Sequence, residues 1–243
     1  MEGAIPTDSS SEIGDPVAGL GERIKGVVFD MDGTIVSSEL DFDRIRAEAR
    51  VPAGVPILEF IAGGASEEVL RVLLEHEDRA ARRCSLQPGA LQVLSSLRGQ
   101  GVKLALFTRN SRDSVRLVLE RLGLEFDCWV AREDAQPKPS PEPVLKIAAT
   151  LGLLPEQLLV VGDYVFDIES GRAAGAVTAL LKTNKHAVPT PPPDLVLEEL
   201  ADLLHWFPAT GGGRPERTGC RQVAGARLKC SPAPSRQTKK EAE

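Results

Sequence analysis

The sequence predicts an α/β fold built around a parallel β-sheet. Short runs of apolar residues, typical of strands that are buried on both faces, recur along the chain. Between them lie segments whose apolar residues follow the three- and four-residue spacing of a helix. Regular alternation of the two patterns predicts parallel strands joined by right-handed helical crossovers. The 243 residues are enough for one such domain with a small insertion.

The first expected strand spans about residues 25–31, and a long helical block follows it. The block runs from residue 37 to about residue 85, and its longest helix starts after Ser66, a suitable N-cap residue. Residues 1–22, ahead of the strand, are rich in Ser, Gly, Asp and Pro and predict a disordered arm. They include no basic residue, which is unlike a secretory or organelle-targeting segment.

The rest of the chain alternates between strand and helix. Four further strands are expected, over residues 102–108, 126–131, 158–162 and 177–181. Helices are expected from Pro88 to Gly101, from Asn110 or Ser111 to Gly123, over residues 142–151 and 166–174, and in a last amphipathic segment that ends near Trp206. Proline in a first turn and glycine just past a last turn set several of these limits. Residues 208–243 predict a disordered basic tail.

Composition and charge limit the classes of partner. The net charge is −6, although the segment after Phe207 holds eight basic and three acidic residues, so the body of the chain is strongly acidic. Such a body argues against nucleic acid as a natural ligand. No apolar run approaches the roughly 18 residues that span a bilayer, so no membrane partner is expected.

The four cysteines favour a reducing compartment. Their spacing fits neither a zinc site nor a redox motif. Cys84 and Cys128 lie in apolar segments, where a free cysteine packs as a small hydrophobic residue. A cytoplasmic location is therefore expected. Nothing in the sequence sets the oligomeric state.

Residues that can handle a phosphate follow several of the expected strands. Asp30, Thr108 and Asp163 each end or follow an apolar run. In an open parallel sheet, ligands bind at the carboxyl ends of the strands, so these residues are expected to meet at one place. Lys138 stands between two prolines, which restrict the backbone that carries it. The combination indicates magnesium-dependent phosphoryl transfer through an aspartyl-phosphate.

Asp30 is the candidate nucleophile. A carboxylate can form an acyl phosphate and divide one difficult step into two. If the chain is still extended two residues later, the Asp32 side chain shares a face with it. If the strand loosens, Asp32 swings over the leaving group, where it can protonate the departing oxygen and later take a proton from the attacking water. Gly33 allows a tight turn, and a hydrogen bond of Thr34 is expected to fix that turn.

Asp163 and Asp167 complete an expected Mg2+ site. Magnesium takes six oxygen ligands, usually a few carboxylates together with water and phosphate. The carboxylates of Asp30 and Asp163 and the main-chain carbonyl of Asp32 are candidate ligands. Asp167 comes four residues after Asp163, where it can bind the metal itself or water on the metal. The cation would relieve the repulsion among these carboxylates.

Residues 108–110 are expected to contact the substrate. Thr108 can donate its hydroxyl to a phosphoryl oxygen, and backbone N–H groups at the start of the next helix can add to this contact. Arg109 either touches the substrate or lines the entrance. Asn110 is the third candidate for substrate binding.

The four motifs together resemble those of the haloacid dehalogenase-like hydrolase superfamily, in its phosphatase branch. The matching residues are Asp-Met-Asp-Gly-Thr at 30–34, Thr108, Lys138 and Gly-Asp-x-x-x-Asp at 162–167. The resemblance runs from about residue 25 to about residue 207 and is closest to the phosphoglycolate-phosphatase-like group. It implies that Lys138 is catalytic and balances the charge between Asp30 and the phosphoryl group.

The resemblance also implies a domain layout and a reaction. Residues 23–36 and 86–207 would form a Rossmann-like parallel-sheet core. Residues 37–85 would form a small α-helical cap, inserted after the first strand. The implied enzyme is a Mg2+-dependent phosphoric monoester hydrolase that acts on a small phosphorylated metabolite.

Other chemistries of the same superfamily are less compatible with the sequence. A true dehalogenase has no use for a second acid together with a metal site. A phosphonate hydrolase uses a lysine of the cap, and no lysine occurs between Lys25 and Lys103. A phosphosugar mutase shares all four motifs and stays an alternative. A non-catalytic regulatory protein is a weaker alternative, because no catalytic residue of the motifs is missing.

Overall fold

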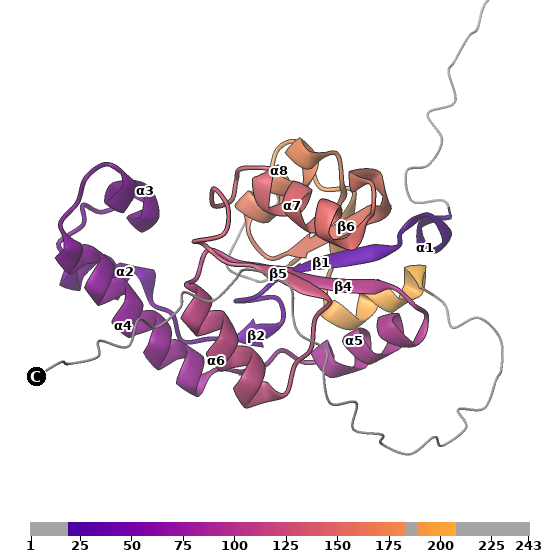
Figure 1. Ribbon diagram of the computed structural model, residues 1–243, viewed down its shortest axis with the longest axis horizontal. Helices are drawn as coiled ribbons and strands as arrows, with labels where there is room; N and C mark the ends of the chain where they lie inside the picture. Colours follow the sequence, from indigo (N-terminus) through magenta and orange to yellow (C-terminus); the bar gives the residue numbers. More distant parts are fainter. Residues whose placement is uncertain (1–18, 183–188, 208–243) are drawn as a thin grey trace, which may run out of the picture.

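A six-stranded parallel sheet forms the centre of the protein (Figure 1). The computed structural model describes residues 19–182 and 189–207. Within these ranges the strand order is β5-β4-β1-β6-β7-β8, and every neighbouring pair is parallel. The strands are β1 (Gly26–Asp30), β4 (Lys103–Phe107), β5 (Cys128–Val130), β6 (Leu158–Gly162), β7 (Val177–Leu181) and β8 (Leu195–Leu197). The predicted α/β fold with a Rossmann-like sheet is confirmed.

Helices cover both faces of this sheet (Figure 1). One face carries α7 (Glu142–Leu151) and α8 (Val165–Ala174), and the other carries α5 (Ala90–Gly99), α6 (Arg112–Leu122) and the 3-10 helix η2 (Leu200–Trp206). Side chains alternate along β1, so Val27 and Phe29 enter the larger apolar core while Val28 enters the smaller one. Burial on both faces explains why the sequence of this strand is continuously apolar.

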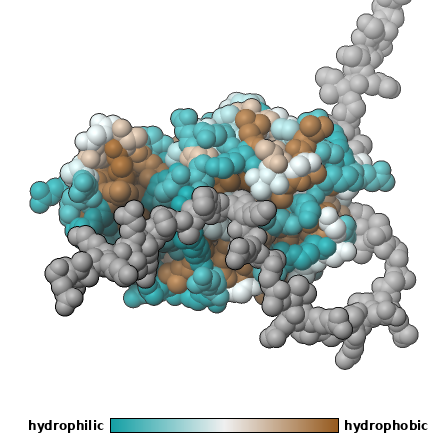
Figure 2. Space-filling view, in the orientation of Figure 1, coloured by the Kyte–Doolittle hydropathy of each residue, from teal (hydrophilic) through white to brown (hydrophobic). Residues whose placement is uncertain are grey.

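The residues between β1 and α5 form a helical segment of their own. A two-stranded antiparallel ribbon, β2 (Val36–Ser37) and β3 (Ser85–Leu86), joins its two ends. The segment contains α2 (Phe42–Glu48), α3 (Ile57–Ala62) and α4 (Glu67–Arg83). These helices bury a separate apolar cluster that includes Ile45, Ile57 and Leu73. The segment lies to one side of the sheet in Figure 1, with α4 packed along α6, and Figure 2 shows apolar surface over it.

The structure departs from the predictions near the ends of the chain. The predicted arm is wrong for its last residues, because α1 (Leu20–Arg23) is a helical turn that buries Leu20 in the core. β8 lies where a loop and a helix were expected, with Leu195 and Leu197 buried on either side of exposed Val196. The expected last α-helix is instead the 3-10 helix η2. Residues 1–18 and the predicted tail, residues 208–243, lie outside the described residues.

Helix limits set by local signals are mostly confirmed. α7 covers the predicted residues, and Ser111 caps α6, its hydroxyl oxygen accepting a bond of 3.3 Å from the Ser114 N–H. α5 starts at Ala90 rather than Pro88, because Gly89 before it is left-handed, with φ 78°. Ser66 precedes α4 as predicted, but its side chain makes no capping bond. Short 3-10 turns such as η1 (Pro155–Gln157) were not predicted.

The described residues include two of the four cysteines and all the helices that can be compared with the expectation of no membrane partner. Cys84 and Cys128 are both buried, as expected for small hydrophobic residues. Cys220 and Cys230 lie outside the described residues. Among the helices that the structure describes, none is long and apolar enough to cross a membrane.

Candidate active site

The three central strands end at one edge of the sheet and bring the predicted residues together. Asp30 is the last residue of β1 and pairs in register with Phe107, the last residue of β4. Thr108 follows directly. On the other side of β1, Asp163 follows Gly162, the last residue of β6. The predicted convergence at the carboxyl ends of the strands is thus found in the structure.

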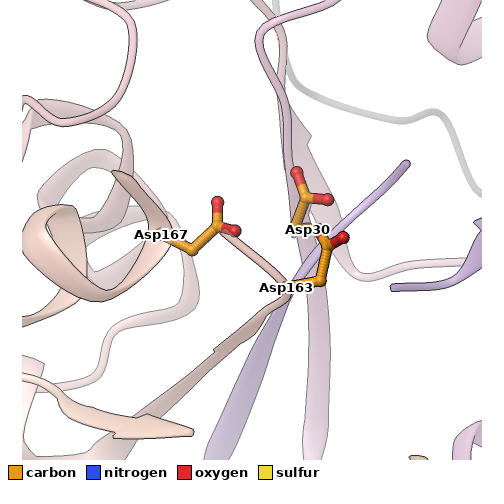
Figure 3. Close-up of side chains that lie close together, drawn as sticks. All are labelled: Asp30, Asp163 and Asp167. Atoms are coloured by element: carbon orange, nitrogen blue, oxygen red, sulfur yellow. The ribbon is translucent and has the colours of Figure 1, made fainter. Parts of the chain in front are cut away.

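Three carboxylates form an acidic cluster at this edge. Asp30 contributes from the end of β1, Asp163 from the residue after β6, and Asp167 from the first turn of α8 (Figure 3). One carboxylate oxygen of each lies within 4.8 Å of the others. The side chains of Asp30 and Asp167 are buried, and that of Asp163 is half-buried. Close packing of like charges in a buried place requires a positive partner.

Lys138 supplies one positive charge to this cluster. Its Nζ lies 2.5 Å from Asp30 Oδ1 and 2.6 Å from Asp167 Oδ1. The same ammonium lies 4.0 Å from the centre of the Phe107 ring, close enough for a cation–π contact. Lys138 lies in the loop between β5 and α7, more than a hundred residues from Asp30 in sequence. Only the fold brings the two side chains together.

Burial and mutual repulsion disturb the titration of this cluster. Burial raises the pKa of Asp30 well above its ordinary value, and the charge of Lys138 opposes this increase. Burial, reinforced by the charge of Asp167, raises the pKa of Asp163 to about 6. Burial alone would lower the pKa of Lys138, but the carboxylates of Asp167 and Asp30 raise it above the ordinary value. One ammonium therefore leaves the cluster with unbalanced negative charge.

The residues present fit a hard divalent cation. All the candidate ligands are oxygens, which Mg2+ prefers. Two glycines leave room for the carboxylates: a Cβ on Gly33 would lie 2.3 Å from Asp163 Oδ2, and a Cβ on Gly162 would lie 2.2 Å from Asp167 Oδ2. Gly33 also has a φ of 89°, which a residue with a side chain rarely adopts. A side chain at either position would displace a candidate ligand.

A tight turn after β1 places Asp32. β1 ends at Asp30, and the Ile35 N–H donates to the Met31 carbonyl oxygen at 3.0 Å. The prediction that Thr34 fixes this turn is wrong: its hydroxyl is buried and has no hydrogen-bond partner among the described residues. Gln87 stabilises the turn instead, because its Nε2 donates a hydrogen bond of 2.8 Å to the Gly33 carbonyl oxygen.

Asp32 binds the loop that follows β4. Asn110 Nδ2 donates to Asp32 Oδ2 at 2.7 Å. Burial raises the pKa of Asp32, hydrogen bonds from Ser38 and Asn110 oppose this increase, and the charge of Glu77 adds to it. Of the two predicted arrangements, the one in which the strand loosens before Asp32 is found. Asn110, predicted to bind substrate, here orients the second acid.

Arg109 connects the core to the helical segment. Its Nη2 binds both carboxylate oxygens of Glu59 in α3, at 2.6 and 2.7 Å, and its Nη1 donates to the Lys138 carbonyl oxygen at 2.7 Å. The guanidinium carbon lies 5.0 Å from the centre of the Phe166 ring. Arg109 therefore lies beside the site, as predicted, with its charge balanced by a residue that the sequence did not single out.

Sequence reasoning missed four residues that shape the site: Glu59, Glu77, Gln87 and Arg132. All are common surface residue types, and none lies in a motif. Glu77 sits on the buried side of α4, inside an otherwise charged stretch of sequence. The only signal in the sequence was its helical spacing from apolar Val69 and Leu73, which places its side chain on the inner face.

Comparisons with known proteins show the family of this chain. The family model of haloacid dehalogenase-like hydrolases matches residues 24–175. An uncharacterized hydrolase of Saccharomyces cerevisiae is 33% identical over 173 residues, covering 67% of this chain and 79% of its own. The phosphoglycolate phosphatase of Salmonella typhimurium is 29% identical over 239 residues, covering 78% of this chain and 94% of its own.

The fold agrees as well. The crystal structure of a hydrolase from Pseudomonas syringae superposes with a TM-score of 0.64 at 23% identity, covering 76% of this chain and 97% of its own. The matched residues contain the strand ends that carry Asp30, Thr108 and Asp163, and the loop that carries Lys138. The resemblance predicted from the motifs is thus confirmed, and the chain belongs to the haloacid dehalogenase-like hydrolase family, with phosphoglycolate phosphatases among its relatives.

Proposed function

We propose that this chain is a Mg2+-dependent phosphatase that hydrolyses a small phosphorylated metabolite through an aspartyl-phosphate on Asp30. The observation that carries the proposal is the position of the Asp30 carboxylate at the end of β1, bound to Lys138 and beside two further carboxylates. Membership of the hydrolase family and the phosphatase among the relatives support it.

In the first step, an Asp30 carboxylate oxygen attacks the phosphorus of the substrate. A bond forms between that oxygen and phosphorus while the bond from phosphorus to the leaving oxygen breaks. Asp32 donates its proton to the leaving oxygen. Two features suit Asp32 to this role: its raised pKa, which favours the protonated form, and the Asn110 amide, which fixes its orientation.

In the second step, water replaces Asp30 at phosphorus. Asp32, now a carboxylate, takes a proton from the water as the water oxygen bonds to phosphorus. The bond between Asp30 and phosphorus breaks, which restores the Asp30 carboxylate and releases inorganic phosphate. Asp32 ends the cycle protonated, so no proton is gained or lost by the protein.

Charge and hydrogen bonding stabilise the phosphoryl group during both steps. The Lys138 ammonium, 2.5 Å from Asp30, balances the negative charge that builds up as nucleophile and phosphate approach each other. The Thr108 hydroxyl oxygen accepts a bond of 3.1 Å from the Asn110 N–H, so its proton can turn toward a phosphoryl oxygen. Arg109, which binds Glu59, is a further candidate for contact with the leaving group.

Asp30, Asp163, Asp167 and the main-chain carbonyl of Asp32 would hold the Mg2+ ion. When bound, the ion supplies positive charge to the phosphoryl oxygens and to the acidic cluster. Lys138 already contacts Asp30 and Asp167, so the ammonium and the ion share the task of balancing the carboxylates.

Phosphate release from a panel of substrates tests the proposal. The panel contains phosphoglycolate, sugar phosphates, nucleotides and a generic aryl phosphate. We expect excess chelator to abolish release and added Mg2+ to restore it, with Asp30→Asn inactive in both conditions. Full activity in excess chelator would refute the metal requirement. Conversion of a sugar phosphate into its isomer, without release of phosphate, would identify a mutase instead.

A further inference from the structure

A buried ion pair lies outside the acidic cluster and the four motifs. Glu77, on the inner side of α4, is 2% exposed, and Arg132, just after β5, is 11% exposed. Arg132 Nη1 lies 2.5 Å from Glu77 Oε1, and Nη2 lies 3.2 Å from Oε2, so the contact is two-pronged. The pair joins the helical segment to the core.

Both partners also bind the backbone of the loop after β4. The Ser111 N–H donates to Glu77 Oε2 at 3.1 Å. Arg132 Nη1 donates to the Arg109 carbonyl oxygen at 3.1 Å, and the Arg132 N–H donates to the Asn110 carbonyl oxygen at 3.0 Å. The side chains of the pair therefore hold Arg109 and Ser111, and the main chain of Arg132 holds Asn110 between them.

This loop carries the groups that face the reacting atoms. Its first residue, Thr108, is tied to the sheet, because its N–H donates to the Val130 carbonyl oxygen at 3.0 Å. Its third residue, Asn110, holds the Asp32 carboxylate. The far end of the loop is held by Glu77 and Arg132, so a displacement of Glu77 would shift the Asn110 amide relative to Asp32.

Stability alone does not account for such a pair. Taking two charges out of water costs free energy that their attraction often fails to offset, so apolar residues of similar size often serve a fold equally well. The hydrogen bonds of this pair to the loop give it a task that apolar residues could not perform.

We propose that Glu77 is a positioning residue: with Arg132, it sets the geometry of the loop of residues 108–111 and thereby the orientation of Asp32 over the leaving group. The inference rests on the proposed phosphatase function for its kinetic consequence, but the positioning of the loop can be measured independently of activity.

The neighbouring residue offers a matched control. His76 is also on α4, is 8% exposed, and pairs with a carboxylate, Glu48 Oε2 at 2.8 Å. Its partner lies on α2, so this pair connects two helices of the helical segment and does not touch the loop. We expect a change at His76 to disturb α4 without releasing residues 108–111.

Hydrogen exchange of the full chain, followed by mass spectrometry, tests the positioning. In Glu77→Gln the amide has one oxygen for three donors, the two Arg132 nitrogens and the Ser111 N–H. We expect faster exchange in the peptide covering residues 108–114 in Glu77→Gln, and unchanged exchange there in His76→Gln. Equal exchange in this peptide for Glu77→Gln and the wild type would overturn the inference, whatever the activity of the protein.

Kinetics test the consequence for Asp32. The quantity to compare is kcat/KM, which reports the phosphorylation of Asp30, because hydrolysis of the aspartyl-phosphate also uses Asp32 and is the same for every substrate. Poorly aligned catalytic groups can cost about 10²-fold, so we expect Glu77→Gln to lower kcat/KM by about that factor for an alkyl phosphate. An aryl phosphate needs little protonation of its leaving group, so its kcat/KM should fall by less than about tenfold. Equal losses of kcat/KM for both substrates would overturn the link to Asp32. His76→Gln should keep the leaving-group dependence of the wild type.

A double variant provides the same test if Glu77→Gln does not fold. If Glu77→Gln fails to fold because Arg132 is left buried and unpaired, Glu77→Leu combined with Arg132→Leu removes both charges. We expect this variant to melt cooperatively yet to show the same faster exchange in residues 108–114. Normal exchange there would refute the inference. An inactive wild type with the expected exchange pattern would instead refute the phosphatase function and leave the positioning supported.

Discussion

Individual carboxyl groups in the acidic cluster have pKa values above those they would have in water. Asp163 is the clearest case, because burial and the nearby charge of Asp167 raise its pKa to about 6. A carboxyl whose folded pKa is raised favours folding while it is protonated. Its contribution to the free energy of unfolding is fully present below the pKa of the unfolded state, about 3.9. This contribution is lost as the pH rises through the folded-state pKa of about 6.

The upward shift of the Asp163 pKa gives a prediction for the metal-free protein. Between about pH 4 and pH 6 the folded state binds more protons than the unfolded state at Asp163, so the free energy of unfolding should fall as the pH rises. Asp163→Asn removes the titrating group. We expect the variant to melt higher than the wild type at pH 7 in chelator and to approach it at pH 5.

Melting curves at both pH values, with and without Mg2+, check this prediction. Added Mg2+ should raise the melting temperature of the wild type at pH 7 more than that of Asp163→Asn, because a ligand that binds only the folded state stabilises it. A difference between the two proteins that does not change with pH would contradict the assigned titration.

The two acids of the first motif are predicted to have separate roles. Asp30→Asn removes the nucleophile, so no covalent intermediate should form. Asp32→Asn keeps the nucleophile and the main-chain carbonyl but loses the proton donor and base. A substrate with a poor leaving group should then react more slowly by the ~10²–10⁴ typical of general acid–base catalysis.

Mass spectrometry separates these roles. An aryl phosphate needs little protonation, so it should still phosphorylate Asp30 in Asp32→Asn, and the adduct should persist because its hydrolysis lacks a base. The same treatment of Asp30→Asn should give no adduct. A phosphoryl group found on another residue, or near-normal turnover of Asp30→Asn, would refute the assignment.

At the scale of secondary-structure elements, α3 contacts the loop after β4 through the ion pair between Glu59 and Arg109. Glu59 is 47% exposed and Arg109 is 21% exposed. Partly exposed pairs of this kind contribute about 0–1 kcal/mol to stability. The pair therefore contributes little to the stability of the fold.

Glu59→Gln should change specificity and leave stability nearly unaltered. Without the Glu59 carboxylate, Arg109 can bind a carboxylate of the substrate with two parallel hydrogen bonds. We expect the KM for phosphoglycolate to fall relative to the KM for a neutral sugar phosphate. Glu68→Gln removes a more exposed pair, with Arg71 on α4, and is the control. Parallel changes of KM for both substrates would contradict the role of Arg109.

The contrast between elements explains what the sequence could and could not predict. β1, β6 and α7 were predicted closely because their signals are local: continuous apolar runs, and a helical period that ends at glycine. β8 was missed because it has only three apolar residues, which come soon after a run of prolines.

Contacts between distant segments carry no such local signal. Asp30 and Lys138 were predicted to meet because each follows a strand or belongs to a motif. Glu77 and Arg132 are 55 positions apart and lie in ordinary charged stretches. Glu77 lies on α4 and Arg132 in the loop after β5, and the periodicity of α4 does not fix where the helix packs on the core.

At the scale of the whole molecule, the last described residues pack in the core. η2 places Leu200 and Leu203 in the larger apolar core, and Phe207 follows them there. The Phe207 carbonyl oxygen also accepts a bond of 3.0 Å from Gln100 Nε2, next to the end of α5. The final residues up to Phe207 thus belong to the core, and the composition changes at the next residue, Pro208.

Two truncations test this boundary. Removing residues 208–243 should leave the melting temperature and turnover almost unchanged, since the composition of that segment predicts no part in the core. Removing residues 200–243 also takes away Leu200, Leu203 and Phe207. Burying a large apolar side chain stabilises by about 1.5–3 kcal/mol, and about 1 kcal/mol corresponds to about 2–4 °C for a domain of this size. The longer truncation should therefore melt more than about 10 °C lower or fail to fold. A loss of several degrees in the shorter truncation would place part of residues 208–243 against the body, and the predicted boundary at Phe207 would then be wrong.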